Sequence, residues 1–371
     1  MFIAPGRRTT GADKTRGRIV TSNATAITIA GRRIGPDAPP FVIAELSANH
    51  NGSLERALDI MTTARESGAD AIKIQSYTAD TITIDHDGPG FRIERGPWAG
   101  RTLHDLYAEA HTPWDWHEAL FAKGRELGLI VFSSPFDASA VDLLRGLDAP
   151  AYKIASFEIV DLPLIRLCAA TGKPLILSTG MADLGEIAEA VAAARDAGAT
   201  EIALLHCTSG YPTPPEEADL RTIPHLGEAF AVPVGLSDHT PGIGAAIAAV
   251  ALGASIIEKH VTLARADGGP DAAFSLEPGE MKSLCDGVTL AWRALGRVRY
   301  ERGASEADNV VFRRSLYITA DMKQGEPLTP ETLRSIRPGY GLPPKYYDML
   351  LGTRVNRDVA RGTPMGWELI G

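Results

Sequence analysis

The chain has 371 residues, with 46 acidic and 37 basic side chains and a formal net charge of −9. This length suits one large domain plus a small one. No apolar run approaches the roughly 20 residues that cross a bilayer, so we expect no membrane role. The negative charge disfavours nucleic acids and acidic membranes as partners, and an anionic substrate would need local positive side chains.

The first 22 residues are basic but lack the apolar stretch of a secretory signal. We therefore interpret residues 1–22 as a flexible leader and expect a cytoplasmic protein. The three cysteines, Cys168, Cys207 and Cys285, are odd in number and far apart. This spacing favours reduced core thiols over a disulfide framework or a zinc cluster.

From residue 41 onward, short apolar runs alternate with alanine-rich segments of helical periodicity. The eight runs are FVIAEL, AIKIQS, IVFSSPF, AYKIAS, PLILST, IALLHC, PVGLSD and SIIEKHV. A Gly-Ala pair precedes three of them, at residues 68, 198 and 253, and is typical of a turn that ends a helix. Eight strand–helix units predict a (β/α)8 TIM barrel, which we assign to residues 23–295 with its amino-terminal extension.

Two stretches depart from this repeat. Residues 77–112 are too long for a simple connection, and long loops after barrel strands are usual places for substrate selection. The eighth helix is predicted near residues 278–295, followed by a charged linker at 296–309. Residues 310–371 have short strands and many turns, which predicts a small, mostly β domain.

The carboxyl ends of parallel barrel strands lie on one face, so polar residues at these ends are expected to share one site. The strand ends carry Glu45, Lys73, Gln75, Ser133, Ser134, Lys153, Ser156, Glu158, Ser178, Thr179, His206, Thr208, Ser209, Ser237, Asp238, His239, Glu258, Lys259 and His260.

Lys73 and Lys153 each interrupt an apolar run in a strand that the fold would bury. A single lysine in a strand is more often a snorkelling or edge residue. Two buried ammonium groups without partners would be costly, which favours an anion such as a phosphate or a carboxylate between them. The alternative is a structural network in which Glu45 and Glu158 neutralise the two lysines.

His239 and His260 end neighbouring strands, which lie about 4.8 Å apart, so both imidazoles can reach one ion. Such a pair suits a divalent metal of the manganese, iron or zinc type. Either histidine alone is more often a hydrogen-bonded interior residue than a metal ligand. His50, beside two asparagines, and His206 stay open for the same reason.

The order and content of several segments resemble the sialic acid synthase family. These segments are AELSANHNGSLERAL, GADAIKIQSYTADTIT, SSPFD, AYKIASFEI, PLILSTGM, LLHCTSGYPTP, GLSDHT and EKHVT. The chain end, with RRSLYITADMKQGEPLT and IRPGYGLPP, resembles the carboxyl-terminal antifreeze-like (SAF) domain of that family. The resemblance covers roughly residues 38–371. Within the family, AELSANHNG and GRTLHDLYAEAHTPWDWH are most similar to the pseudaminic acid synthase branch.

The resemblance implies an enzyme that condenses phosphoenolpyruvate with a diacetamido-trideoxy hexose, 2,4-diacetamido-2,4,6-trideoxy-L-altrose, and releases phosphate. Sialic acid and legionaminic acid synthases use other N-acetylated hexoses and are the alternatives. It also implies a divalent metal, Mn²⁺ or Mg²⁺ with Co²⁺ possible, and a domain-swapped homodimer in which Arg337 reaches the partner's barrel. The expected product is a nonulosonic acid for cell-surface glycans, including those on flagellin.

The matching positions imply specific roles. Those for phosphoenolpyruvate are Lys73, Gln75, Ser134, Lys153, Ser156, Ser209 and Ser237, and those around the sugar are Glu45, Glu158, Tyr211, Asp271 and Arg337. His239 and His260 match the metal ligands. Ser209 and Ser134 stand where the family commonly has Asn and Thr, respectively.

Glu45 is the candidate for general acid or base work, and beside two lysines it is expected to stay ionised. Asp238 is expected to orient a metal ligand. Two rival hypotheses are a carbohydrate-binding protein without catalysis and an aldolase that uses pyruvate and releases no phosphate.

Overall fold

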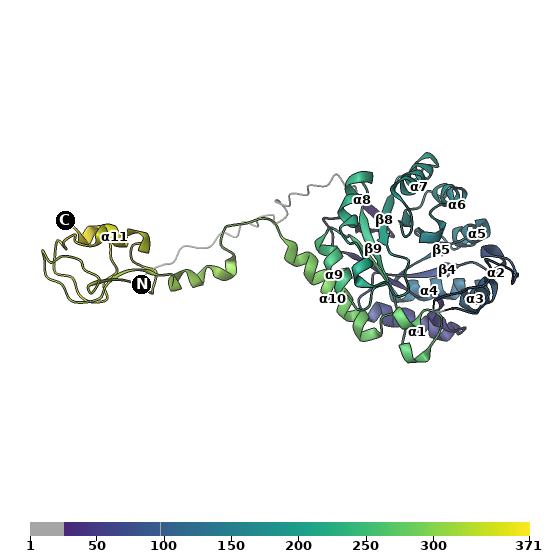
Figure 1. The fold of residues 1–371 in the computed structure, drawn as a ribbon, viewed down its shortest axis with the longest axis horizontal. Coiled ribbons are helices and arrows are strands. Elements are labelled where there is room, and N and C mark those ends of the chain that lie inside the picture. Colours follow the sequence, from purple (N-terminus) through teal and green to yellow (C-terminus); the bar gives the residue numbers. More distant parts are fainter. Residues whose placement is uncertain (1–25, 97) are drawn as a thin grey trace, which may run out of the picture. The chain divides into compact units, whose positions relative to one another are not determined.

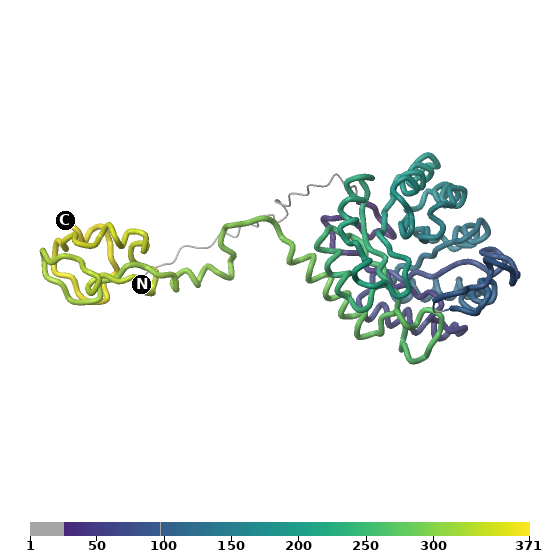
Figure 2. The backbone as a smooth tube through the Cα atoms, viewed as in Figure 1, coloured from purple at the N-terminus to yellow at the C-terminus, as the bar shows by residue number. Residues whose placement is uncertain are grey.

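The computed structural model describes residues 26–96 and 98–371 (Figure 1). The chain forms two compact units, which meet in the sequence at Arg297 and Val298. Figure 2 follows the backbone of each unit from the amino-terminal to the carboxyl-terminal end. The leader expected at residues 1–22 lies outside the described residues.

Within the described residues of the first unit, eight parallel strands close into a barrel in the order β10-β3-β4-β5-β6-β7-β8-β9. The strands are β3 (Phe41–Glu45), β4 (Ala71–Ser76), β5 (Ile130–Pro135), β6 (Tyr152–Ile154), β7 (Leu175–Ser178), β8 (Ile202–Cys207), β9 (Val234–Asp238) and β10 (Ile256–His260). Each coincides with one of the eight apolar runs, so the TIM barrel prediction is confirmed.

Helices follow the strands and surround the barrel (Figure 1). They are α1 (Leu54–Glu66), α4 (His117–Leu127), α5 (Ala138–Gly146), α6 (Leu162–Ala169), α7 (Leu184–Asp196), α8 (Thr222–Phe230), α9 (Gly244–Ala251) and α10 (Pro278–Leu295). The long connection after β4 contains two further helices, α2 (Ala79–Ile82) and α3 (Leu103–Ala110). The eighth barrel helix, α10, has the bounds expected from the sequence.

The Gly-Ala pairs end helices α1, α7 and α9 in the same way. Gly68, Gly198 and Gly253 have φ values of 97°, 99° and 100°, a region that glycine enters without steric cost. After each glycine, the alanine N–H donates to the carbonyl five residues earlier at 3.0 Å, as Ala69 does to Ala64. This Schellman-type turn directs the chain into the next barrel strand.

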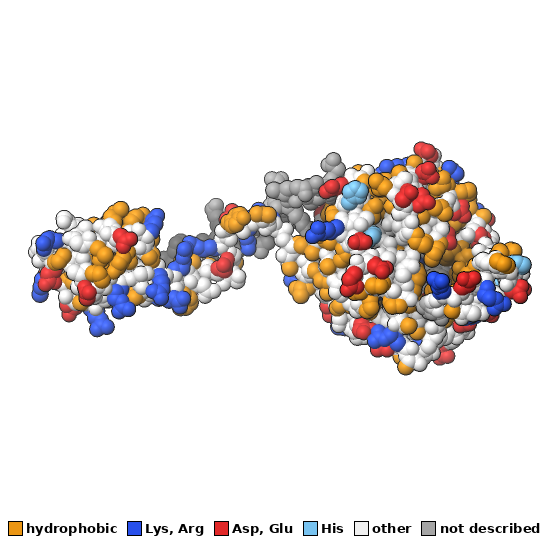
Figure 3. All heavy atoms as spheres, in the orientation of Figure 1, with side chains coloured by type: hydrophobic (Ala, Val, Ile, Leu, Met, Phe, Trp, Pro, Cys, Tyr) orange, Lys and Arg blue, Asp and Glu red, His pale blue; other side chains and the backbone are white. Residues whose placement is uncertain are grey.

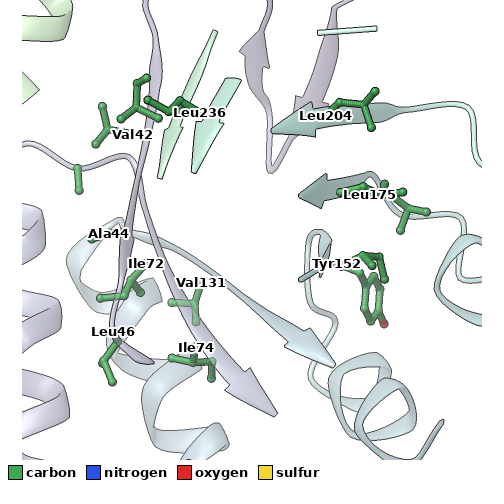
Figure 4. Packing of buried hydrophobic residues seen from close by; sticks show 14 of the residues in the cluster. Val42, Ala44, Leu46, Ile72, Ile74, Val131, Tyr152, Leu175, Leu204 and Leu236 are labelled. Carbon is green, nitrogen blue, oxygen red and sulfur yellow. The ribbon is translucent and has the colours of Figure 1, made fainter. Parts of the chain in front are cut away.

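Strand side chains alternate between the helix layer and the barrel interior. Outward residues such as Val42, Ile72 and Leu236 pack under the helices in the main core (Figure 4). At the amino ends of the strands, the interior is filled by apolar side chains. A small hairpin of β1 (Ile27–Ile29) and β2 (Arg32–Ile34) packs its isoleucines against this inner cluster. Polar interior side chains are therefore confined to the carboxyl ends.

The second unit, Val298–Gly371, has its own apolar core. Two antiparallel strands, β11 (Ser315–Ile318) and β12 (Leu333–Ile336), pair along their length, and the short helix α11 (Tyr347–Leu350) packs nearby. Isolated bridges, such as Met322 with Val359, link its turns. The sequence predicts a small domain with short strands here, and the structure has one, in which β11 and β12 pair antiparallel.

Acidic and basic side chains are interspersed with hydrophobic ones over the visible face of the barrel unit (Figure 3). In the part of the chain that the structure describes, each helix is too short or too polar to span a bilayer.

Candidate active site at the carboxyl end of the barrel

The strand register brings ionisable side chains together inside the barrel. Glu45 on β3 pairs with Lys73 on β4 in the register, and with His260 on β10 on the other side. Glu258 stands two residues before His260 and therefore faces the interior as well, opposite Ser237 on β9. All five side chains are buried. The site is thus a layer of charged side chains at the carboxyl ends of the strands, next to the apolar side chains that fill the barrel interior at the amino ends.

Two lysines and two carboxylates form the centre of this layer. Lys73 Nζ lies 3.0 Å from Glu45 Oε2 and 3.4 Å from Glu258 Oε1. Lys153 Nζ lies 3.9 Å from Glu258 Oε1 and donates to Ser178 Oγ at 2.6 Å. Glu258, rather than Glu158, therefore shares the neutralisation of the lysines with Glu45. Among the described residues, Glu258 Oε2 has no hydrogen-bond partner.

Burial and pairing act differently on the four groups. Burial would lower the pKa of Lys73, but Glu258 and Glu45 raise it above its ordinary value. Burial lowers the pKa of Lys153. Burial would raise the pKa of Glu258, but both lysines lower it, while burial raises the pKa of Glu45 despite Lys73. The pKa of Glu258 is therefore shifted below its ordinary value and that of Glu45 above it.

A second arm of the network extends toward the loop after β10. Gln75 Nε2 donates to Glu45 Oε1 and to Ser47 Oγ, each at 3.0 Å. Ser47 Oγ in turn donates to Asp271 Oδ2, which also accepts from the Ala48 N–H at 3.4 Å. Burial raises the pKa of Asp271. Asp271 is thereby joined to the lysine pair through side chains of the first two barrel strands and the loop after β3.

Small donors gather beside Lys153 at the ends of β6, β7 and β8. The Gly180 N–H donates to Ser156 Oγ at 3.2 Å. A Cβ at Gly180 would lie 2.3 Å from Ser209 Oγ and 2.7 Å from Ser156 Oγ, so only glycine leaves both hydroxyls in place. Around the lysines, Lys73 Nζ donates to Ser134 Oγ at 3.4 Å, and Ser237 Oγ donates to Glu258 Oε1 at 3.1 Å. Hydroxyls beside ammonium groups suit an anion with several oxygens.

The two candidate metal ligands face each other. The imidazole rings of His239 and His260 have centroids 5.3 Å apart. The Nδ1 of His239 lies 3.0 Å from the Thr208 carbonyl, which fixes the N–H there and leaves Nε2 as a free lone pair. Burial keeps the pKa of His260 well below its ordinary value, so this ring is neutral.

The donor set fits a divalent metal in part. Over the described ranges, His260 Nδ1 is buried without a hydrogen-bond partner. Two imidazoles beside carboxylates are ligands that such ions accept. Within residues 26–96 and 98–371, however, His, Cys, Asp and Glu form no group of three that could hold an ion. Substrate or water oxygens would have to complete the coordination.

Two further expected sugar residues lie beside this centre. Tyr211 packs its ring 4.4 Å from that of His239. Glu158 follows β6 in a short 3-10 helix, and burial raises its pKa to about 7 although Lys153 opposes the shift. As far as the structure describes the chain, its Oε2 is buried without a hydrogen-bond partner. Arg337 is exposed in the second unit, just after β12.

Other rim residues have structural partners. Asp238 points outward from β9 and accepts from Lys259 Nζ at 2.8 Å and from Thr240, so the orienting role expected for it is not what the structure shows. His206 contacts the Ala218 carbonyl at 2.8 Å. His50 accepts from the Gly52 N–H and packs edge-on against Trp116.

Sequence reasoning placed Glu258 and Ser178 among the polar strand ends but assigned them no role, and it did not name Ser47 and Gly180. Strand alternation places Glu258 and Ser178 on the same side as His260 and Ile176, which is the signal that could have assigned them to the interior. Ser47 and Gly180 lie in loops, whose course no periodic pattern specifies.

Comparison with known proteins gives consistent matches over both units. The NeuB family model matches residues 60–300, and the SAF domain model matches residues 313–370. The chain is 44% identical to the pseudaminic acid synthase of Campylobacter jejuni, over 88% of this chain and 95% of that protein. It is 42% identical to the pseudaminic acid synthase of Helicobacter pylori, over 88% and 96%.

A solved structure supports the same fold. The N-acetylneuraminic acid (sialic acid) synthetase from Leptospira borgpetersenii, crystallised in complex with citrate, superimposes with a TM-score of 0.69. It is 32% identical in sequence, and the match covers 77% of this chain and 95% of that one.

Proposed function

The chain belongs to the NeuB family, and from this premise we propose that it condenses phosphoenolpyruvate with 2,4-diacetamido-2,4,6-trideoxy-L-altrose, releasing phosphate and forming a nonulosonic acid. The observation that carries the proposal is the pair of buried lysines, Lys73 and Lys153, bridged by Glu258 inside the barrel. The identity to the pseudaminic acid synthases exceeds that to the sialic acid synthetase, which favours the altrose as acceptor.

Phosphoenolpyruvate carries both a phosphate and a carboxylate, and the layer offers cations and hydroxyls for each. Ser156 and Ser209 border the small Gly180 position, and together with Lys153 they would bind one anionic group. Lys73, Ser134 and Ser237 would bind the other, with Gln75 positioning the enol carbon through its link to Glu45. Holding both reactants in one orientation supplies much of the rate.

The bonds change in three steps. Carbon 3 of phosphoenolpyruvate attacks the aldehyde carbon of the open-chain sugar, so the C–C bond forms, the aldehyde oxygen becomes an alkoxide and carbon 2 gains cationic character. Water adds at carbon 2, and one of its protons is transferred to the alkoxide. The C–O bond to phosphate then breaks, the remaining hydroxyl proton leaves with the phosphate, and carbon 2 becomes the ketone of the product.

Glu45 is suited to the proton transfers at the reacting carbons. Burial raises its pKa above that of an exposed glutamate, which is the direction that favours general acid or base work. Asp271 and Tyr211 also lie at the carboxyl end of the barrel and would bind hydroxyl or amide groups of the sugar. Glu158 lies near the two lysines. His239 and His260 would hold a divalent metal, Mn²⁺ or Mg²⁺ with Co²⁺ as a further candidate, which supplies Lewis-acid polarisation of the aldehyde oxygen.

The test is phosphate release from phosphoenolpyruvate in the presence of Mn²⁺ and each of three acceptors. These are the altrose, N-acetylmannosamine and the diacetamido-trideoxy precursor of legionaminic acid. We expect turnover with the altrose and a product whose mass and NMR spectrum match the nine-carbon acid. Absence of phosphate with all three would overturn the proposal, and product formed from pyruvate without phosphate would favour the aldolase hypothesis.

The second unit supplies the remaining part of the proposal. Exposed Arg337 would contact the sugar in the barrel of a partner subunit, giving a domain-swapped homodimer. Mixing inactive His239→Ala and Arg337→Ala proteins under subunit exchange should recover part of the activity, because one barrel then regains both groups. No recovery in a mixture shown to exchange subunits would contradict sharing. Phosphoenolpyruvate is a cytoplasmic metabolite, so we place the reaction in the cytoplasm.

A further inference from the structure

In the long connection after β4, Trp98 reaches the loop after β10. Residues 91–96 and 98–103 form a hairpin-like turn, in which Ile93 exchanges backbone hydrogen bonds with Arg101 and Gly100 at 2.9 and 2.8 Å. The Nε1 of Trp98 donates to the Pro270 carbonyl at 3.0 Å, 172 residues later in the chain. The connection is therefore anchored beside Asp271.

Trp98 continues an aromatic cluster that borders the two histidines. Its ring centroid lies 5.9 Å from that of Tyr211, and Tyr211 lies 5.2 Å from Phe274. Phe274 in turn packs edge-on at 5.0 Å from His260 and 6.3 Å from His239. We call Trp98, Tyr211 and Phe274 the aromatic wall.

The aromatic wall contrasts with the polar layer beside it. Phe274 has no polar side-chain atom, and the indole N–H of Trp98 is already bound to Pro270. A sugar hydroxyl placed against the rings of Trp98 and Phe274, away from the Tyr211 hydroxyl, would lose water without gaining a hydrogen bond, which is costly. A methyl group placed there would bury apolar surface, which is favourable.

We propose that the aromatic wall selects acceptors that carry a methyl group, and that Trp98 and Phe274 are specificity-determining residues. This inference rests on the proposed function, because it concerns the acceptor of the same site. The methyl group can come from the deoxygenated carbon 6 or from an acetamido substituent. Both present the same apolar surface, so the experiment must separate them.

The first measurement is discrimination between the altrose and its 6-hydroxy counterpart, as a ratio of kcat/KM values. Removal of one methyl-sized contact changes such ratios by roughly 10- to 200-fold. We expect Trp98→Ala and Phe274→Leu to reduce the preference for the deoxy sugar by about tenfold while the KM for phosphoenolpyruvate stays unchanged. Trp98→Phe, which keeps a ring but loses the N–H donor, should keep most of the preference.

The second measurement needs no turnover. Saturation-transfer NMR with irradiation of the aromatic protons reports which methyl group of the bound altrose lies against the rings. A strong carbon 6 methyl signal assigns that source, and a strong acetamido signal assigns the other. Either signal should weaken in Trp98→Ala. Phe91→Leu is the matched control, because Phe91 belongs to the same turn but contacts His86.

The outcomes separate the two proposals. If the wild type binds the altrose through a methyl group but turns over none of the acceptors, the proposed reaction fails and the aromatic wall stands. If the altrose is turned over and Trp98→Ala and Phe274→Leu keep both the preference and the methyl signals, the aromatic wall is overturned and the reaction stands. If Trp98→Ala does not fold, Phe274→Leu decides.

Discussion

Two buried ionic groups lie on opposite faces of the same strands and differ in how completely they are satisfied. On the outer face of β9 and β10, Lys259 Nζ lies 2.8 Å from Asp238 Oδ2, and Thr240 donates to the other carboxylate oxygen from its N–H and its hydroxyl. On the inner face, Glu258 faces Lys73 and Lys153 at 3.4 and 3.9 Å. No described residue forms a hydrogen bond with the Oε2 atom of Glu258.

This difference separates a structural ion pair from a binding site. The outer pair is closed, because each oxygen of Asp238 has its donor without any further molecule. The inner group is not closed in this way, because Glu258 Oε2 has no donor among the described residues and Lys153 Nζ lies 3.9 Å from the nearest carboxylate oxygen, which leaves this ammonium group available to a substrate anion. Burial lowers the pKa of both Lys153 and Lys259, so the two faces differ in what surrounds each lysine rather than in its depth.

Breaking the outer pair, Lys259 and Asp238, should have the largest expected effect, and this effect should be a loss of stability. Lys259→Met leaves the Asp238 carboxylate buried without its cation, which costs about 3–5 kcal/mol in comparable cases. We expect the urea midpoint of the barrel to fall accordingly, while kcat/KM per folded molecule changes much less. Lys282→Met is the control, since its exposed pair with Asp286 should contribute at most about 1 kcal/mol. Equal stabilities for the two variants would remove the distinction between the faces.

The same substitution on the inner face should act on activity. Lys153→Met leaves Glu258 still paired with Lys73 and Ser237, so we expect the free energy of unfolding to change by less than about 1 kcal/mol. Loss of a charged donor to a substrate anion should lower kcat/KM by about 10²- to 10³-fold. Steady-state kinetics with varied phosphoenolpyruvate provide the measurement. A destabilisation as large as that of Lys259→Met, with activity retained, would make the inner group structural too.

The sequence was sufficient for the barrel, because strand runs and helical periodicity repeat eight times and every run is a strand. It also placed Lys73, Lys153, His239 and His260 at one rim, since parallel strands present their carboxyl ends together. It could not decide which carboxylate bridges the lysines. Glu158 comes shortly after β6, and Glu258 lies within β10, so both are near strand ends in the sequence. Only the closed barrel brings Glu258 between Lys73 and Lys153.

Loop residues set the limit of prediction. Asp238 and His239 are adjacent, yet one pairs outward with Lys259 and the other contacts the Thr208 carbonyl, because the strand ends between them. Trp98 reaches Pro270 through a connection without periodic pattern. Contacts of this kind depend on tertiary packing and carry no local signal.

Glu158 offers the smallest effect and tests the inner face through pH. Burial raises its pKa to about 7, above the ordinary 4.5, so the folded state holds more protons than the unfolded state between these values. Stability should therefore fall as the pH rises through this window, by at most roughly 3 kcal/mol for a shift of this size. Glu158→Gln stays neutral, so its stability relative to the wild type should be unchanged below pH 4.5 and higher above pH 7. Urea unfolding across this pH range measures the difference in the free energy of unfolding between the two proteins. If their free energies depend on pH in the same way, Glu158 is solvated and burial does not disfavour its charged form.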